Sequence, residues 1–274
     1  MSWFRVKTIA KTDLRQLAQA RDFWGPMVIL GSVFFVFVPL VLLLAITHVG
    51  DIHAVQQVSQ ALDLLPQKAQ AAIRGQSDAA RTSYALAVYL FAPVAVVVPL
   101  TIATAVGATT IVGERERGTG EFLAHSPAAL EDIYLGKLIA SLLPGYATTI
   151  VGFGAYSLIV NLVVGPKVGG WFFPTPAWWV LMIWVVPPFL ALTLAIVVRF
   201  SAKAKSSAAA QQVAGLVSLP MIVIAYSQST GALFGATNTG YVIGALAWIA
   251  AIFGLTRGMR SMTRARLLGV ADEA

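Results

Sequence analysis

Cysteine is absent from the 274-residue chain, and charged residues are scarce at 11%. Without cysteine, neither a disulfide framework nor a thiolate metal site can form. Soluble domains carry about 25% charged residues, whereas this chain is 58% hydrophobic and has a mean hydropathy of +0.78. A single soluble core cannot bury so much apolar surface, so the composition places the chain in the integral membrane class.

Ionisable residues are also missing from long stretches of the chain. Residues 84–112 and 138–166 contain no Asp, Glu, Lys, Arg or His. Transporters driven by protons or sodium place such groups within the membrane, so this class is disfavoured, as is a channel with a charged pore. No HExxH, GxSxG or GxxxxGK[ST] string occurs, which disfavours a membrane hydrolase and a nucleotide-binding site. We therefore expect no catalytic residue, no metal site and no cofactor in this chain.

Six apolar runs are each long enough to cross a bilayer, which takes about 20 helical residues. The predicted spans lie near 26–47, 84–112, 133–163, 177–199, 207–228 and 241–258. Several of these runs contain proline, which removes a backbone donor and bends a helix. Bilayer helices tolerate such a residue when a neighbour satisfies the freed carbonyl.

Residues 1–25 precede the first span and predict an amphipathic helix. Val6 and Leu14 belong to an apolar row at helical spacing, while Lys7 and Lys11 belong to a basic face. A basic amphipathic helix is suited to the headgroup region of a membrane, in contact with lipid. A docking surface for a cytoplasmic partner is the alternative interpretation.

The basic residues predict the orientation of the chain. Fifteen of the 19 Lys and Arg residues lie beside the termini or on the second and fourth connections, which share one side of the membrane. The positive-inside rule therefore places both termini, including the tail at 259–274, in the cytoplasm. The net charge of +7 comes from basic residues that lie almost entirely at the ends of the apolar runs. It therefore does not indicate a nucleic-acid partner.

The connection between the second and third spans is a dense charged segment at 113–127. Carboxylates near a helix start complement the helix dipole, and we place Glu114 and Glu116 in this role. The arginines offer charge-assisted contacts, the glycines allow a bend or a close approach, and the apolar side chains offer anchors. The candidate contact residues are Glu114, Arg115, Glu116, Arg117, Gly118, Thr119, Glu121, Phe122 and Leu123. From the residues alone, a solvated connection without a partner is the favoured interpretation.

Residues 114–127 resemble the charged cytoplasmic segment of type-2 ABC export permeases, and residues 131–137 resemble the motif that follows it there. The stretches 9–15 and 201–220 are similar to further parts of the same family. The resemblance therefore covers most of the chain in order. It departs at two positions, Gly120 and His125, where the family usually has Leu and commonly has Thr.

The resemblance implies a fold and a function. The expected fold is an all-α integral membrane protein over 1–274, with six transmembrane helices, an N-terminal amphipathic interfacial helix and a cytoplasmic coupling helix. The implied assembly contains a second permease subunit, same or related, and two copies of a separate ATP-binding cassette subunit that binds ATP and Mg. Such an exporter works by alternating access at the interface of the permease dimer, in the cell membrane of a bacterium.

The uncharged, aromatic-rich interior favours a hydrophobic or amphipathic cargo such as a lipid, drug or peptide. The alternative function is a membrane scaffold or regulatory subunit that anchors an ATPase without moving a solute. The sequence does not decide between a homodimer and a heterodimer.

Overall fold

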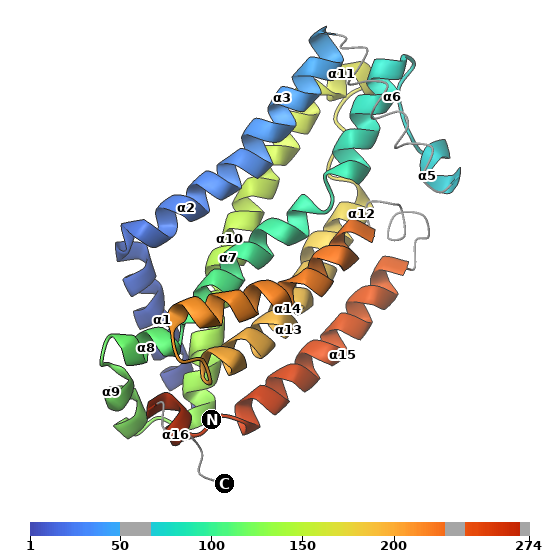
Figure 1. The fold of residues 1–274 in the computed structure, drawn as a ribbon. Coiled ribbons are helices and arrows are strands. Elements are labelled where there is room, and N and C mark those ends of the chain that lie inside the picture. Colours follow the sequence, from blue (N-terminus) through green and yellow to red (C-terminus); the bar gives the residue numbers. More distant parts are fainter. Residues whose placement is uncertain (50–66, 228–238, 269–274) are drawn as a thin grey trace.

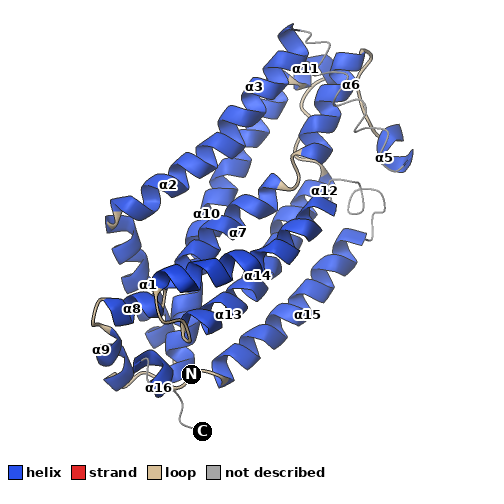
Figure 2. Cartoon of the chain, in the orientation of Figure 1, coloured by secondary structure: helices blue, strands red, loops and turns tan. Residues whose placement is uncertain are grey.

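The computed structural model describes residues 1–49, 67–227 and 239–268. Every regular element within these ranges is a helix, as Figure 2 shows. The elements of the first half are α1 (Trp3–Gln19), α2 (Arg21–Ser32), η1 (Val33–Phe37), α3 (Val38–Leu44), η2 (Ala45–Val49), α5 (Gln67–Ala71), α6 (Asp78–Ala85), η3 (Leu86–Leu90) and α7 (Val94–Thr109). The elements of the second half are α8 (Val112–Glu116), α9 (Gly120–His125), α10 (Leu130–Val163), α11 (Gly165–Val168), α12 (Pro176–Trp179), η4 (Val180–Val185), α13 (Val186–Ser201), α14 (Ser207–Ser227), α15 (Thr239–Arg260) and α16 (Arg264–Leu268).

Five helical runs in the described part of the chain are long and apolar enough to cross a membrane. They are Phe23–Thr47, Asp78–Thr109, Leu130–Val163, Pro176–Ser201 and Thr239–Arg260. These runs coincide, within a few residues at most ends, with five of the six predicted spans. The remaining predicted span, at 207–228, falls on α14, and the count of six stays a prediction. The expected amphipathic helix is α1, which ends at Gln19 rather than continuing to residue 25.

The helix α7 lies at the centre of the bundle, where it packs against α10, α13 and α14. The most apolar part of the span that contains it is 78% buried, against 22% for the span formed by α15. This central helix carries no ionisable side chain, which agrees with its burial along most of its surface. The peripheral α15 leaves large apolar side chains exposed, among them Leu246 and Ile249, as a helix facing lipid or another subunit does.

Widened helical turns precede Pro93 and Pro187, and in both a side chain from another helix bonds to the carbonyl left without a donor. Within η3, the carbonyl of Val88 lies five residues before Pro93 and accepts the indole N–H of Trp178 at 2.9 Å. Within η4, the hydroxyl of Tyr146 donates at 3.0 Å to the carbonyl five residues before Pro187. These bonds confirm the expectation that neighbours compensate for proline inside a span.

One end of the bundle gathers α1, α8, α9 and α16 beside the N-terminus, as Figure 1 shows. We call this the α8–α9 end. The opposite end carries α5, α6 and α11 (Figure 1). Most of the long connection before α5 lies outside the described residues, as do residues 269–274 of the expected C-terminal tail. The charged segment thus lies among the N-terminal and C-terminal helices.

Candidate functional site

The charged segment forms two short helices, α8 and α9, in place of the single coupling helix expected from the sequence. The break is a hydrogen-bonded turn around Gly118, whose φ of +74° lies in the left-handed region. The N–H of Gly118 donates to the carbonyl of Arg115 at 3.0 Å, and the N–H of Thr119 donates to the carbonyl of Glu114 at 2.9 Å. This pair of bonds is the Schellman motif, which ends helices at a glycine. The chain therefore turns sharply between α8 and α9.

A buried ion cluster attaches α8 to two other helices. The ammonium of Lys137, on α10, donates to Glu114 Oε1 at 2.8 Å and to Asp13 Oδ2 at 3.0 Å. The Lys137 side chain is only 3% exposed, and the two carboxylates are 13% and 15% exposed. Arg117 adds a longer, exposed contact to Glu114 at 3.4 Å. One buried cation thus joins α1, α8 and α10.

The two carboxylates of this cluster have pKa values that move in opposite directions. Burial raises the pKa of Asp13, and the ion pair with Lys137 offsets only part of this effect. Burial acts in the same direction on Glu114, but the ion pair and hydrogen bond with Lys137, together with Thr119 and Arg117, outweigh it, so the pKa of Glu114 is lowered. The hydroxyl of Thr119 also donates to the Glu114 carboxylate. Lys137 also lies slightly closer to Glu114, at 2.8 Å, than to Asp13, at 3.0 Å.

Two further residues of α8 bond to the connection between α13 and α14. Arg115 donates to the carbonyls of Ser201, at 3.4 Å, and Ala204. Glu116 accepts the backbone N–H of Ser207, the first residue of α14, at 2.7 Å. The Ser207 hydroxyl and N–H lower the pKa of Glu116. We predicted that Glu116 would lie near the start of its own helix, and this was wrong: it ends α8, and its carboxylate instead complements the positive end of α14.

The second helix of the segment, α9, has an inward and an outward face. Gly120 and Ala124 are buried, and Leu123 packs partly against the core. Phe122, by contrast, is 80% exposed, and Glu121 is exposed beside it. Phe122 and Glu121 therefore form the outward face of α9, where they are free to contact another protein.

The C-terminal helix α16 packs against the inward face of α9. Arg264 donates to the carbonyls of Ala124 and, at 3.4 Å, Ser126, where α9 ends. A cation at a helix C-terminus satisfies carbonyls that have no partner within the helix. A Cβ added to Gly120 would lie 3.0 Å from the carbonyl oxygen of Leu267. The departure from the family pattern at Gly120 therefore coincides with the close approach of α16.

The nine candidate residues lie together in the α8–α9 segment, but they have two different kinds of surroundings. Glu114, Arg115 and Glu116 bond to other helices of the same chain, whereas Glu121 and Phe122 face outward. Sequence reasoning did not assign a role to Asp13, Lys137 or Arg264. The position of Lys137 could have predicted an ion pair, because it lies next to an uncharged stretch of 29 residues. A lysine there needs an acidic partner when the helix is buried. Among the described residues, no group of three His, Cys, Asp or Glu side chains could hold a metal ion.

These features define a multi-pass helical membrane protein with a charged, internally bonded segment at one end. A family model described as ABC-2 family transporter protein matches residues 7–264, nearly the whole chain. The chain therefore belongs to this family and is a permease component of an ABC transporter, the transmembrane part and not the ATPase. Permeases of the family generally work with a separate ATP-binding subunit. No curated protein matches the chain significantly.

Proposed function

We propose that the chain is the transmembrane subunit of an ATP-driven exporter, and that α9 receives the movement of a separate cytoplasmic ATP-binding subunit. The observation that carries the proposal is the two-sided arrangement of the α8–α9 segment. Its outward face presents Phe122 and Glu121, whereas its inward face and α8 are bonded to helices throughout the permease. A solvated connection without a partner would need neither feature.

The outward face has the chemistry of a protein contact. Buried aromatic anchors supply a large part of the binding energy at protein interfaces. Phe122 would fill an apolar groove on the ATP-binding subunit, and Glu121 would pair with a cation at its rim. The ATP and Mg would be held wholly by that subunit, in two copies beneath two permease subunits.

The bonded side supplies a route for movement into the membrane. Displacement of α9 pulls on α8, and the Glu114–Lys137 pair, with a separation of 2.8 Å, transmits the displacement to α10. The bond of Glu116 to the start of α14 transmits it to a second helix. Movement of two membrane helices by one segment suits alternating access at the interface between the permease copies.

The membrane part favours an apolar or amphipathic cargo. The polar side chains of the spans are mainly hydroxyls, and Thr104, Ser141, Thr149 and Thr193 each donate to the backbone of their own helix. Such groups offer no fixed charge to an ionic solute. A lipid, drug or peptide is therefore the cargo that we propose, exported from the cytoplasmic side.

The test compares two phenylalanines of equal exposure. Phe122 is 80% exposed on α9 and Phe4 is 79% exposed on α1, so Phe122→Ala and Phe4→Ala remove the same side chain from the same degree of solvation. A hot-spot aromatic contributes about 2 kcal/mol, so Phe122→Ala should weaken binding of the cognate ATP-binding subunit by roughly thirtyfold. Phe4→Ala should leave binding unchanged, and equal effects of the two variants would refute the assignment of α9.

Charge reversal gives a second test, and the exposure of each glutamate determines which residue to change. Glu114 is buried in the permease, so reversing it would disrupt the Lys137 cluster rather than a contact with a partner. Glu121 is exposed, and Glu121→Lys should lower ATPase stimulation in liposomes without changing the stability of the permease alone. ATP-dependent movement of lipid in the same liposomes supports an exporter, whereas assembly without any movement of cargo would support the scaffold.

A further inference from the structure

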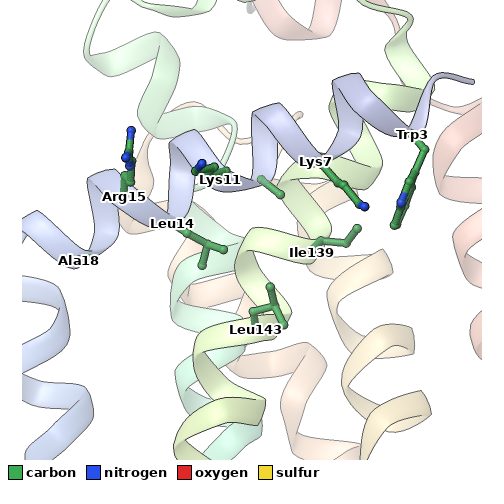
Figure 3. Close-up of a pocket in the computed structure, with 9 residues that line it drawn as sticks. Trp3, Lys7, Lys11, Leu14, Arg15, Ala18, Ile139 and Leu143 are labelled. Carbon is green, nitrogen blue, oxygen red and sulfur yellow. The ribbon is translucent and has the colours of Figure 1, made fainter.

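We infer that the groove between α1 and α10 binds the headgroup and the upper acyl chain of an anionic phospholipid. The groove has a volume of about 400 Å³, and Figure 3 shows residues of α1 and α10 that line it. Its lining combines three basic side chains from α1 with apolar side chains from both helices. Neither the proposed export nor the contact with an ATPase uses these residues.

The basic residues form one row along α1. Lys7, Lys11 and Arg15 are spaced four residues apart, so they share a face of the helix. All three are exposed, and no ion pair within the described residues includes any of them. Asp13 is the acidic residue of α1, and it contacts Lys137 on the side of the helix that faces the bundle. The groove therefore presents cations that no acidic side chain neutralises.

The floor of the groove continues into the membrane. Ile139 and Leu143 of α10 lie below α1 in Figure 3, and Lys7 extends from α1 toward Ile139. Leu143 is 42% exposed, and Ile150, two turns further along the span, is 43% exposed. Residues seven apart share a helix face, so an acyl chain could follow this exposed apolar track. The ammonium of Lys7 also lies 5.6 Å from the centre of the Trp3 ring, an aromatic position typical of the membrane interface.

The groove is held open by contacts that fix α1 on α10. The N–H of Ser2 donates to Asp132 at 2.9 Å, and Arg5 donates at 2.8 Å to the carbonyl of Pro127, just before α10. Further along α1, Ile9 packs so closely that a Cβ on Gly136 would lie 2.8 Å from it. A site formed before its ligand arrives avoids part of the ordering cost of binding.

The combination of groups favours a lipid over other anions. A soluble phosphate would gain nothing from the apolar floor, and an acidic peptide would have to enter the region of the span to cover it. An anionic phospholipid fits both the basic row and the apolar floor of the groove. Its phosphate pairs with the basic row, and its acyl chain covers Leu143. Basic pockets at the cytoplasmic ends of membrane helices bind anionic headgroups in this way.

The absence of cysteine from the chain allows a reporter at a single position. Ala147 lies one turn beyond Leu143 and is exposed, so Ala147→Cys can carry a fluorescent label beside the groove without filling it. The full chain is placed in phosphatidylcholine nanodiscs that contain a fixed fraction of brominated phosphatidylglycerol or brominated phosphatidylcholine. Quenching of the label measures which lipid occupies the site. Stronger quenching by phosphatidylglycerol is expected, and equal quenching by the two lipids would overturn the proposal.

Removal of the basic row should abolish this preference. Each Lys or Arg near an anionic surface contributes about fivefold to binding, so Lys7→Gln/Lys11→Gln/Arg15→Gln should reduce the preference for phosphatidylglycerol at least tenfold. The control Arg21→Gln/Lys205→Gln/Arg260→Gln removes the same charge from three exposed positions outside the groove. An equal loss in the control would show that bulk surface charge attracts the lipid, and the groove would then not be a site.

Two further measurements separate the occupants. Leu143→Trp fills the apolar floor and keeps every charge, so it should lower quenching by phosphatidylglycerol to the level of phosphatidylcholine even if the triple variant misfolds. Millimolar inorganic phosphate should not displace the brominated lipid. Displacement by phosphate would show that the groove takes a soluble anion, and loss of quenching on adding the ATP-binding subunit would show that a protein covers it; either result overturns the proposal.

Discussion

Replacement of Lys137 by methionine tests the ion cluster that joins α1, α8 and α10. Methionine has a similar length and a flexible apolar side chain, so Lys137→Met leaves little cavity. It removes the ammonium that lies 2.8 Å from Glu114 and 3.0 Å from Asp13. Two mostly buried carboxylates then keep only the exposed Arg117, 3.4 Å from Glu114, as a neighbouring cation.

The expected cost follows from this burial. Removing one partner of a buried ion pair typically costs about 3–5 kcal/mol, because the remaining charge stays desolvated. Protonation of one carboxylate would relieve part of the repulsion, so we expect about 3 kcal/mol at neutral pH. For a chain of this size, this corresponds to a fall in melting temperature on the order of 5–10 °C. The same change should reduce the coupling of ATPase activity to transport, because α8 is no longer held to α10.

A neutral replacement of the whole cluster provides the control. Buried ion pairs are often replaced at little cost when all members become neutral together, so Asp13→Asn/Glu114→Gln/Lys137→Met should recover most of the lost stability. Thermal unfolding of the purified permease in detergent, followed by tryptophan fluorescence, measures both variants. The reasoning is refuted if Lys137→Met unfolds at the wild-type temperature, or if the triple variant is no more stable than Lys137→Met.

Three further predictions concern the same end of the protein. Because the pKa of Asp13 is raised, the folded state gains stability as the pH falls through that raised pKa toward 3.8. The pKa of Glu114 is lowered, so its contribution to stability is present above the ordinary pKa of 4.5 and is lost as the pH falls through the lowered pKa. In melting curves measured from pH 7 to 3, Asp13→Asn should therefore remove the gain in stability on acidification, and Glu114→Gln should remove the loss in stability. Identical pH profiles of the two variants would contradict the opposite pKa shifts of these carboxylates. Arg264→Ala should weaken the attachment of α16 by about 1 kcal/mol and speed hydrogen exchange in residues 120–126 by roughly fivefold, with unchanged exchange as the contrary result. Gly118→Asn should be tolerated, since asparagine accepts a positive φ, whereas Gly120→Asn should separate α16 from α9, which limited proteolysis of the C-terminus would detect.

Much of the fold could be predicted from the sequence, because the membrane imposes a simple rule. Runs of about 20 apolar residues must become helices when no water can satisfy the backbone, and five such helices lie where the composition places them. The positions of prolines predicted compensating donors, but not which ones. The choice of Trp178 for the Val88 carbonyl depends on how helices pack, which a pattern along one chain does not contain.

The charged segment connects two long helices, as expected, but its division into two helices was not foreseen. Alternating Glu and Arg residues look equivalent in a sequence, since each is a polar residue on a polar connection. Their difference arises from contacts with residues far along the chain: Glu114 meets Lys137, and Glu116 meets Ser207. Gly120 departs from the family pattern for a reason that the sequence does not contain: a Cβ there would lie 3.0 Å from the carbonyl oxygen of Leu267.

The two proposals meet in the helix α1. One face of this helix carries Asp13, which bonds to Lys137 in the cluster that holds α8, and the other carries the basic row that lines the lipid groove. If bound lipid shifts α1 on one face, the shift reaches the cluster on the other. Coupling between binding sites is reciprocal, so if anionic lipid strengthens the contact of α9 with its ATPase, the ATPase must strengthen lipid binding by the same factor. The Ala147→Cys reporter measures that factor directly, because its quenching by phosphatidylglycerol can be titrated with and without the ATP-binding subunit. A factor of one would show that the two faces of α1 act independently, whatever each of them binds.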